Sequence, residues 1–404
     1  MAETDNVVRV DPAGGGLDGF FKISERGSTV GTEIGAGVTT WLTMAYILFV
    51  NPAILGFVGI PGLQRIGLPF DQVLTVTALV AGVMTIAMGV VGNYPFALAA
   101  GLGLNAFVAF TLVVAGQGTV VTLGHDLATW RIGVFAVGLL ITSTLVARKM
   151  RGALLVGIIV TTVIATIVND VANRGIWAHG IAAIPRKVVA TPDFALVGNF
   201  SFSFVSKLGF WTAAAVVISV GLSDFFDTMG TVIGIGGEAG MLDREGRLPG
   251  IKRVLLIDSL AAVAGGVCSS SSNTTYIESA SGVSDGGRTG LASVITGALF
   301  LLALFFSPIA GVVPPEATAP ILVIVGYFMM TLAKDIEWSD PGIGIPVLLT
   351  ILMMPFTYSI TNGVGAGFLS YTVIAMLRGR ARDVHLLMYL VSGIFAWYFI
   401  HGVV

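Results

Sequence analysis

Long apolar stretches separated by short polar ones run along almost the whole chain. The apolar stretches occupy residues 34–55, 73–91, 132–147, 153–168, 210–235, 254–267, 291–309, 319–332 and 384–400, with two shorter ones at 346–360 and 364–377 split by Thr361, Asn362 and Gly363. A helix of about 20 apolar residues crosses the hydrocarbon core of a bilayer. The pattern therefore predicts an all-α protein that crosses a membrane many times.

One stretch, residues 268–282, interrupts this pattern because it is almost entirely polar and carries a single carboxylate, Glu278. A backbone without an apolar side is tolerated at membrane depth only where it is buried in protein or lines a cavity. A charged side chain there costs about 2.5–3.5 kcal/mol on insertion scales, which makes Glu278 a candidate functional residue. The alternative is a polar loop outside the membrane, but the flanking apolar stretches leave little room for one.

A second interruption lies at residues 93–107, where Pro95, Gly101 and Gly103 disfavour a regular helix before about Leu104. An extended piece followed by a half-helix over residues 107–114 would direct backbone N–H groups toward the membrane midplane. Asn105 lies near the start of that half-helix, where it could contact a substrate or pack against another helix. The residues alone leave both roles open.

The two interruptions divide the chain into corresponding halves. Paired interruptions of this kind are typical of transporters built from inverted repeats, with the substrate site between them. We expect a cytoplasmic tail at residues 1–30, a first repeat at 31–172, a connecting loop at 173–208 and a second repeat at 209–404. The first repeat is shorter by about two spans with a turn, and the loss of a pair of spans keeps the inverted relation.

Composition and charge narrow the class of protein further. Hydrophobic residues make up 55% of the chain and charged residues 11%, and the net charge of −2 does not suit nucleic-acid binding. Basic residues gather at 148–151, 244–253 and 378–382, so these turns are expected on the cytoplasmic side. A single cysteine, Cys268, excludes an intramolecular disulfide.

Two further carboxylates lie within the apolar stretch at residues 210–235. Asp224 and Asp227 are three residues apart and therefore share one helix face. Apolar residues precede and follow them, which argues against the alternative that both lie at a water interface. We expect Asp224 to contact a substrate or proton and Asp227 to orient Asp224 by hydrogen bonding.

Several motifs resemble those of the AzgA-like purine permeases, a branch of the nucleobase–cation symporters. They are Gly37-Val38-Thr39-Thr40-Trp41-Leu42-Thr43-Met44-Ala45-Tyr46, Val50-Asn51-Pro52-Ala53, Gly101-Leu102-Gly103-Leu104-Asn105-Ala106-Phe107, Asp224-Phe225-Phe226-Asp227-Thr228-Met229-Gly230-Thr231, Thr274-Thr275-Tyr276-Ile277-Glu278-Ser279, Gly287-Arg288-Thr289-Gly290 and Met354-Pro355-Phe356-Thr357-Tyr358-Ser359-Ile360. The resemblance implies a uracil-permease-like fold with a core domain and a gate domain. It also implies that Asn105, Asp224, Asp227 and Glu278 bind substrate and couple protons.

The function implied by this resemblance is import of purine nucleobases (guanine, hypoxanthine, adenine or xanthine) by proton symport across the plasma membrane. The resemblance implies no cofactor and no metal, with the proton as the coupling ion, and it allows a homodimer. Between residues 114 and 119 the chain departs from the family, which has its fourth and fifth spans there. The departure coincides with the shortened first repeat.

The chemistry of a purine suits these residue types, because carboxylates accept hydrogen bonds from ring N–H groups and aromatic side chains cover flat faces. Gly103, Phe225, Thr275 and Tyr276 are candidates for the cavity wall, although packing against lipid or core is the alternative for each aromatic residue. A carboxyl group can also gain and release a proton. One of the three acids is therefore expected to carry the coupled proton.

Two other interpretations compete with a transporter. A membrane enzyme is disfavoured, because the Gly-x-Gly-Asp context of intramembrane aspartyl proteases is absent and the four histidines are scattered without metal-ligand spacing. A non-transporting remnant that binds purine weakly or not at all is the stronger alternative, because two spans are missing. Binding and uptake measured in the same preparation would separate these interpretations.

Overall fold

A computed structural model describes residues 16–58, 63, 65–106, 109, 130–172, 177, 180–185, 187–357 and 360–400. Among these residues, seven helical stretches are long and apolar enough to cross a membrane: Val30–Leu55, Phe70–Gly92, Trp130–Ala147, Ala153–Asp170, Thr212–Gly237, Gly290–Ala310 and Ile360–Leu377. Three shorter apolar helices are Pro315–Phe328, Pro341–Thr357 and Leu386–Ile400. The chain is an all-α, multi-pass membrane protein, as the hydrophobic pattern predicts.

The described elements of the first half are α1 (Leu17–Phe21), α2 (Val30–Met44), α3 (Ile47–Leu55), α4 (Phe70–Ala87), the π-helical turn η1 (Met88–Gly92), β1 (Leu98–Ala100), α5 (Leu102–Ala106), α6 (Trp130–Ala147) and α7 (Ala153–Ala172). The expected first span is thus two helices, α2 and α3, which meet at Ala45 and Tyr46. The half-helix expected at 107–114 and the shortened connection after it lie outside the described residues.

The second half begins with α8 (Ser203–Leu208), which lies inside the segment expected to be a loop. It continues with α9 (Phe210–Glu238), α10 (Ile251–Val267), β2 (Asn273–Thr275), α11 (Ser279–Ser284), α12 (Gly290–Ala303), η4 (Leu304–Phe306), α13 (Ser307–Ala310), α14 (Pro315–Thr331), η5 (Leu332–Asp335), α15 (Pro341–Thr357), α16 (Ile360–Leu377), η6 (Ala381–Asp383) and α17 (Leu386–Ile400).

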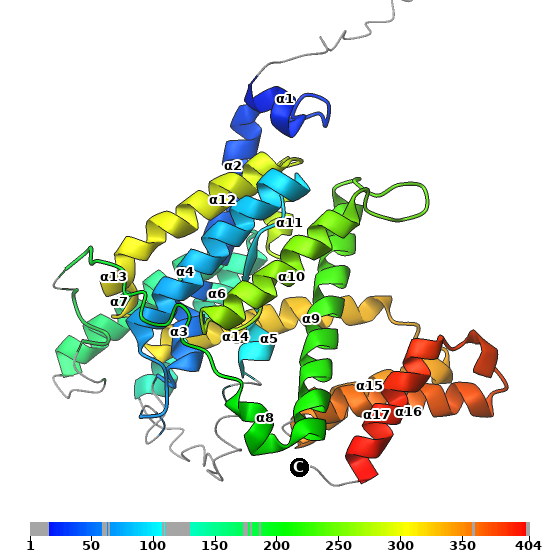
Figure 1. The fold of residues 1–404 in the computed structure, drawn as a ribbon. Helices are drawn as coiled ribbons and strands as arrows, with labels where there is room; N and C mark the ends of the chain where they lie inside the picture. Colours follow the sequence, from blue (N-terminus) through cyan, green and yellow to red (C-terminus); the bar gives the residue numbers. More distant parts are fainter. Residues whose placement is uncertain are drawn as a thin grey trace, which may run out of the picture.

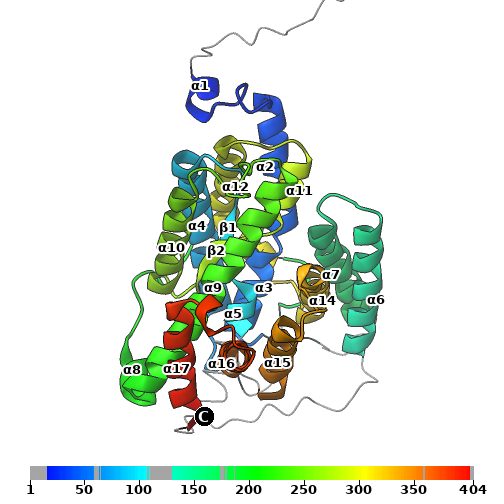
Figure 2. The same cartoon turned by 90° about the vertical axis from the view of Figure 1, so that its right-hand side faces the viewer.

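The two interrupted segments meet at the centre of the helical assembly. β1 and β2 pair antiparallel, with Leu98 opposite Thr275, Ala99 opposite Thr274 and Ala100 opposite Asn273. Figure 2 shows the pair surrounded by α2, α4, α9, α10 and α12. Both interruptions are extended segments followed by a short helix, as expected, but α5 starts at Leu102, two residues earlier than predicted, because helical backbone tolerates Gly103.

Close helix packing supports this centre from one side. The helix α12 packs along α2 and α4, and Gly89 of η1 lies against Gly290 of α12. A Cβ on Gly290 would lie 1.8 Å from the carbonyl oxygen of Gly89, so only glycine permits this approach. Small residues that let backbones approach closely are a common device of membrane helix packing.

Two helical hairpins flank the centre. The first is formed by α6 and α7 and packs against α14, and the second is formed by α15 and α16 (Figure 1). The two short apolar stretches are separate helices, as the pattern indicates, but α16 already begins at Ile360, so Thr361, Asn362 and Gly363 do not separate them. All three are buried inside α16, and a Cβ on Gly363 would lie 2.8 Å from the carbonyl oxygen of Thr350 on α15. The close contact between the two helices explains this polar, glycine-containing stretch.

Candidate functional site

A cavity of about 250 Å³ lies beside the paired strands. Its walls come from both interrupted segments, from the junction of α2 and α3, and from α9, α14, α15 and α16. Its lining residues are Tyr46, Gly101, Leu102, Gly103, Ser223, Asp227, Thr231, Thr274, Thr275, Tyr276, Ile277, Glu278, Val325, Met354 and Ile360. Of the residues proposed from the sequence, Gly103, Asp227, Thr275, Tyr276 and Glu278 are brought together here. Asn105, Asp224 and Phe225 are not among the lining residues.

Glu278 stands between β2 and α11, at the residue that precedes the half-helix. The Tyr46 hydroxyl donates a hydrogen bond of 2.5 Å to its Oε1 atom. Tyr46 is fully buried and lies where α2 gives way to α3, so the interruption of the first span places a phenol against the carboxylate. In the sequence Tyr46 is only one residue of a motif, and its contact with Glu278 forms because the α2–α3 junction and the segment after β2 meet in the fold.

The two aspartates of α9 have different surroundings. Asp227 faces the cavity, and no hydrogen bond to its carboxylate is formed among the described residues. Asp224 lies one turn away, where the Ser272 hydroxyl donates a hydrogen bond of 2.9 Å to its Oδ1 atom. Asp227 thus lines the cavity and Asp224 is bound by the polar stretch before β2, while the division of roles expected from the sequence stays a prediction.

A third aspartate, Asp258 of α10, was not singled out from the sequence, although it is the only carboxylate in its apolar stretch. Its Oδ1 atom accepts hydrogen bonds of 2.9 Å from both the backbone N–H and the hydroxyl of Thr275. Its Oδ2 atom accepts one of 2.7 Å from the Thr228 hydroxyl. Asp258 therefore joins β2 to α10 and α9 behind the cavity wall.

Hydrogen bonds from Tyr276, which follows β2, further stabilise the strand pair. The Tyr276 hydroxyl donates a hydrogen bond of 2.5 Å to the carbonyl oxygen of Ala100, and the Tyr276 N–H donates one of 2.9 Å to the carbonyl oxygen of Ala97. Tyr276 thus lines the cavity with its ring while its polar atoms hold β1. Phe225, in contrast, is 46% exposed and packs edge-on against Phe226 outside the cavity.

Asn105 belongs to a buried polar cluster instead of the cavity wall. Its Nδ2 atom donates a hydrogen bond to Oδ1 of Asn51, whose own Nδ2 atom donates one of 2.7 Å to Thr77 and one of 3.3 Å to the carbonyl oxygen of Ser270. Both asparagines are completely buried. The helix-packing alternative left open for Asn105 thus matches its surroundings, and its partner Asn51 belongs to the Val50-Asn51-Pro52-Ala53 motif.

The cavity combines two carboxylates with apolar and aromatic walls. Asp227 and Glu278 offer up to four oxygen acceptors, and no lysine, arginine or histidine is among the lining residues that the structure describes. Within the described part of the chain, no group of three histidine, cysteine, aspartate or glutamate residues is arranged to hold a metal ion. The site is therefore suited to an uncharged or cationic ligand that presents several hydrogen-bond donors.

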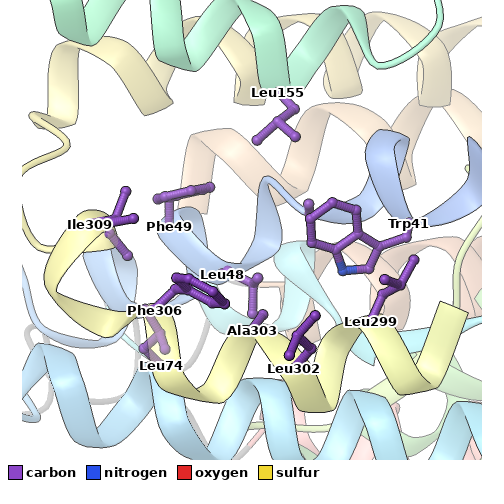
Figure 3. A pocket seen from close by; sticks show the side chains of 12 residues that line it. Trp41, Leu48, Phe49, Leu74, Leu155, Leu299, Leu302, Ala303, Phe306 and Ile309 are labelled. Atoms are coloured by element: carbon purple, nitrogen blue, oxygen red, sulfur yellow. The ribbon is translucent and has the colours of Figure 1, made fainter. Parts of the chain in front are cut away.

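A separate cavity is lined by apolar side chains. It has a volume of about 170 Å³ and lies where α2 and α3 face α4, α7 and α12. Figure 3 shows that Leu48, Phe49, Leu155 and Phe306 surround it, with the Trp41 ring at one end. An apolar cavity without convergent polar groups cannot orient a polar substrate, and such cavities stay dry. The carboxylate-lined cavity is therefore the candidate site.

Comparison with known proteins agrees with this geometry. Residues 116–366 match the model of the xanthine/uracil permease group, described as "Permease family". The chain is 34% identical to adenine permease AdeQ of Escherichia coli over 97% of this chain and 98% of that protein, and 31% identical to guanine/hypoxanthine permease PbuG of Bacillus subtilis over 94% and 99%. Adenine permease AdeP of E. coli is 35% identical over 91% and 92%.

The alignment with AdeQ extends over 457 positions, more than the 404 residues of this chain. AdeQ therefore contains residues that have no counterpart here, which is consistent with missing spans. A strand pair formed by two interrupted segments, two carboxylates in the cavity beside it and similarity along nearly the full length lead to one conclusion. The chain belongs to the xanthine/uracil permease family of membrane transport proteins.

Proposed function

We propose that this protein is a secondary active transporter that imports purine nucleobases across the plasma membrane by proton symport. The observation that carries the proposal is the position of Asp227 and Glu278, which face one cavity between the strand pair and helices α14, α15 and α16. The relatives named as adenine and guanine/hypoxanthine permeases support a purine as the substrate class.

The cavity suits a flat molecule of this kind. Its volume of about 250 Å³ is below the roughly 300–1,000 Å³ typical of pockets for drug-sized ligands, so it favours a small ligand. The Tyr276 ring and the side chains of Val325 and Met354 can cover the faces of a purine. Carboxylate oxygens of Asp227 and Glu278 can accept hydrogen bonds from its ring N–H and exocyclic amine groups.

Proton coupling is proposed from the same residues. Ionisable side chains at membrane depth are rare and commonly serve as proton relays. Asp227 has no hydrogen-bond donor among the described residues, so its carboxyl group is free to take up a proton or a ligand N–H. Glu278, by contrast, already accepts a hydrogen bond from Tyr46. We therefore assign the exchangeable proton to Asp227.

A specific observation favours a second candidate, a protein that binds purine without efficient transport. One face of α10 is open, with Leu256, Leu260 and Val263 each more than half exposed. In a membrane protein such a face contacts lipid or a further helix, and the second candidate assumes that the missing spans would cover it. Without them, alternating access would lack part of the packed interface across which two domains move.

The test combines binding and uptake on the same purified protein. Equilibrium binding of radiolabelled hypoxanthine, guanine and adenine is measured in detergent, and uptake is measured in proteoliposomes with and without an inward proton gradient. Binding together with uptake that a protonophore abolishes supports proton symport, and uptake driven only by a sodium gradient contradicts the proton. Binding without uptake supports the second candidate, and absence of binding refutes both.

A further inference from the structure

A cavity distinct from the apolar one in Figure 3 lies one helical turn along α9 from the carboxylate-lined cavity, and we name it the second cavity. It has a volume of about 430 Å³ and is bounded by α9, α15, α16 and the start of α17. Ser223 lines both cavities, and Asp227 follows Ser223 by four residues on the same helix face. The two cavities are therefore neighbours along one side of α9, which Figure 1 shows beside the cluster of α15, α16 and α17.

Aromatic side chains form two walls of this second cavity. Phe226 comes from α9 and Phe368 comes from α16. Each ring is supported by another aromatic residue: Phe226 lies 5.5 Å from Phe225, and Phe368 lies 6.3 Å from the buried Phe395. Both rings present apolar faces on which a flat ligand can stack, and the Phe226 ring is 55% exposed and therefore accessible.

Hydroxyl groups are placed beside these rings. The Ser223 and Tyr371 side chains line the cavity, and neither hydroxyl forms a hydrogen bond within the part of the chain that the structure describes. The Thr350 hydroxyl, in contrast, already donates to the carbonyl oxygen of Pro346 in its own helix. A lipid acyl chain would make no use of two free hydroxyls. A heteroaromatic ring with N–H and carbonyl groups would use both the hydroxyls and the ring faces.

We infer that this second cavity is a docking site for a flat heteroaromatic base of the same class as the ligand of the carboxylate-lined cavity. The inference rests on the proposed function, because it takes the ligand class from there. A base would stack between Phe226 and Phe368 and hydrogen-bond to Ser223 and Tyr371, one helical turn from Asp227. No charged side chain lines this cavity among the described residues, so its affinity is lower, by about tenfold or more.

The test is the number of bases bound per chain. Equilibrium dialysis of the purified full-length chain with radiolabelled adenine and hypoxanthine should show two sites, one tight and one weak. Val364→Phe places a ring into the second cavity, and Tyr371→Phe removes only a hydroxyl. We expect Val364→Phe to abolish the weak site and Tyr371→Phe to weaken it about threefold or more, with the tight site changed less than about twofold in each.

A matched control is Val373→Phe, the same change at a lipid-accessible position of α16 that does not line the cavity. It should leave both sites intact. Glu278→Gln should weaken the tight site and leave the weak one. A single site in the unaltered chain, or a weak site that survives Val364→Phe, overturns the inference while leaving the proposed function standing. Absence of any bound base refutes both. Lipid co-purified with the unaltered chain but lost from Val364→Phe assigns the cavity to an acyl chain and overturns the inference.

Discussion

The carboxylates of the site differ in how many protein groups bind them. Asp227 is free to meet a ligand, Glu278 accepts a hydrogen bond from Tyr46, and Asp258 accepts three from Thr228 and Thr275. A carboxylate whose oxygens are already satisfied has little capacity left for a ligand and instead holds the surrounding backbone. This ordering predicts ligand binding at Asp227 and Glu278 and a structural role at Asp258.

Replacement of Glu278 by glutamine should lower purine affinity by about tenfold or more, because a neutral amide replaces a carboxylate acceptor where water is scarce. Equilibrium binding of radiolabelled purine measures the effect. Glu25→Gln is the control, because Glu25 is an exposed residue paired with Lys22 far from the cavity. Unchanged affinity in the Glu278 variant would remove this residue from the binding site.

Replacement of Asp258 should act on stability first. Asp258→Ala leaves the Thr275 N–H and two hydroxyls without their acceptor, and each buried unsatisfied group costs about 1–3 kcal/mol. Asp258→Asn keeps one oxygen acceptor, so its midpoint of thermal unfolding in detergent should lie between those of the unaltered chain and the alanine variant. Equal midpoints for all three proteins would show that this cluster does not hold β2.

At the scale of elements, the half-helix α11 connects the site to the flanking hairpin of α6 and α7. Glu278 precedes α11, and Asp285 follows it. The Asp285 Oδ1 atom lies 2.7 Å from Nη2 of Arg151 in the turn between α6 and α7, and its Oδ2 atom accepts a hydrogen bond of 2.6 Å from the Thr39 hydroxyl of α2. Any movement of the hairpin relative to α11 must break this ion pair.

Arg151→Ala should therefore affect transport more than stability or binding. The Arg151 side chain is 71% exposed, so its loss should lower the free energy of unfolding by less than about 1 kcal/mol. The initial uptake rate should change by about twofold or more while purine affinity stays the same. About 0.5 M salt should reduce the difference, because it screens exposed charges.

Arg148→Ala is the control for this experiment, since Arg148 is an exposed residue of the same turn and has no ion-pair partner among the described residues. A change in affinity together with an unchanged uptake rate in Arg151→Ala would contradict a role in movement.

At the scale of the whole molecule, the two halves are unequal in a way that the packing reveals. The first long helices of the two halves, α2 and α9, differ in how closely other elements approach them. A Cβ on Gly37 would lie 2.5 Å from the Ala292 carbonyl oxygen of α12, whereas one on Gly221 would meet nothing within 4 Å. The helix α12 thus covers α2, and none of the described elements covers α9 at Gly221.

If the second candidate function is correct, this asymmetry leads to binding without efficient accumulation. Purine affinity should stay within about tenfold of that of AdeQ of E. coli, while the initial rate of gradient-driven uptake should be lower by about tenfold or more, unless a second protomer supplies the missing wall. Both proteins are reconstituted at equal density and measured under the same inward proton gradient. Equal uptake rates would show that the two spans are dispensable.

The amino-acid sequence by itself determined the membrane class, the helical fold and the two interruptions with their extended segments. Membrane spans follow from local hydropathy, and the two interruptions follow from Pro95, Gly101 and the polar stretch around Glu278. Each of these features depends on residues close together in the chain, so a local pattern reveals it. Most spans were placed within a few residues for the same reason. Glu278 was also found this way, because a carboxylate among apolar spans is conspicuous without knowledge of its partners.

Only the tertiary structure decided which polar residues face the cavity. Asn105 hydrogen-bonds to Asn51, Asp224 to Ser272 and Asp258 to Thr275, and none of these pairs is close in the chain. In a membrane protein a helix can contact protein or lipid on any side, so periodicity does not identify the side that meets a cavity. The pairing of β1 with β2 brings the two interrupted segments together, so that Glu278 and Tyr276 line one cavity with Asp227 while Asn105 is buried against Asn51.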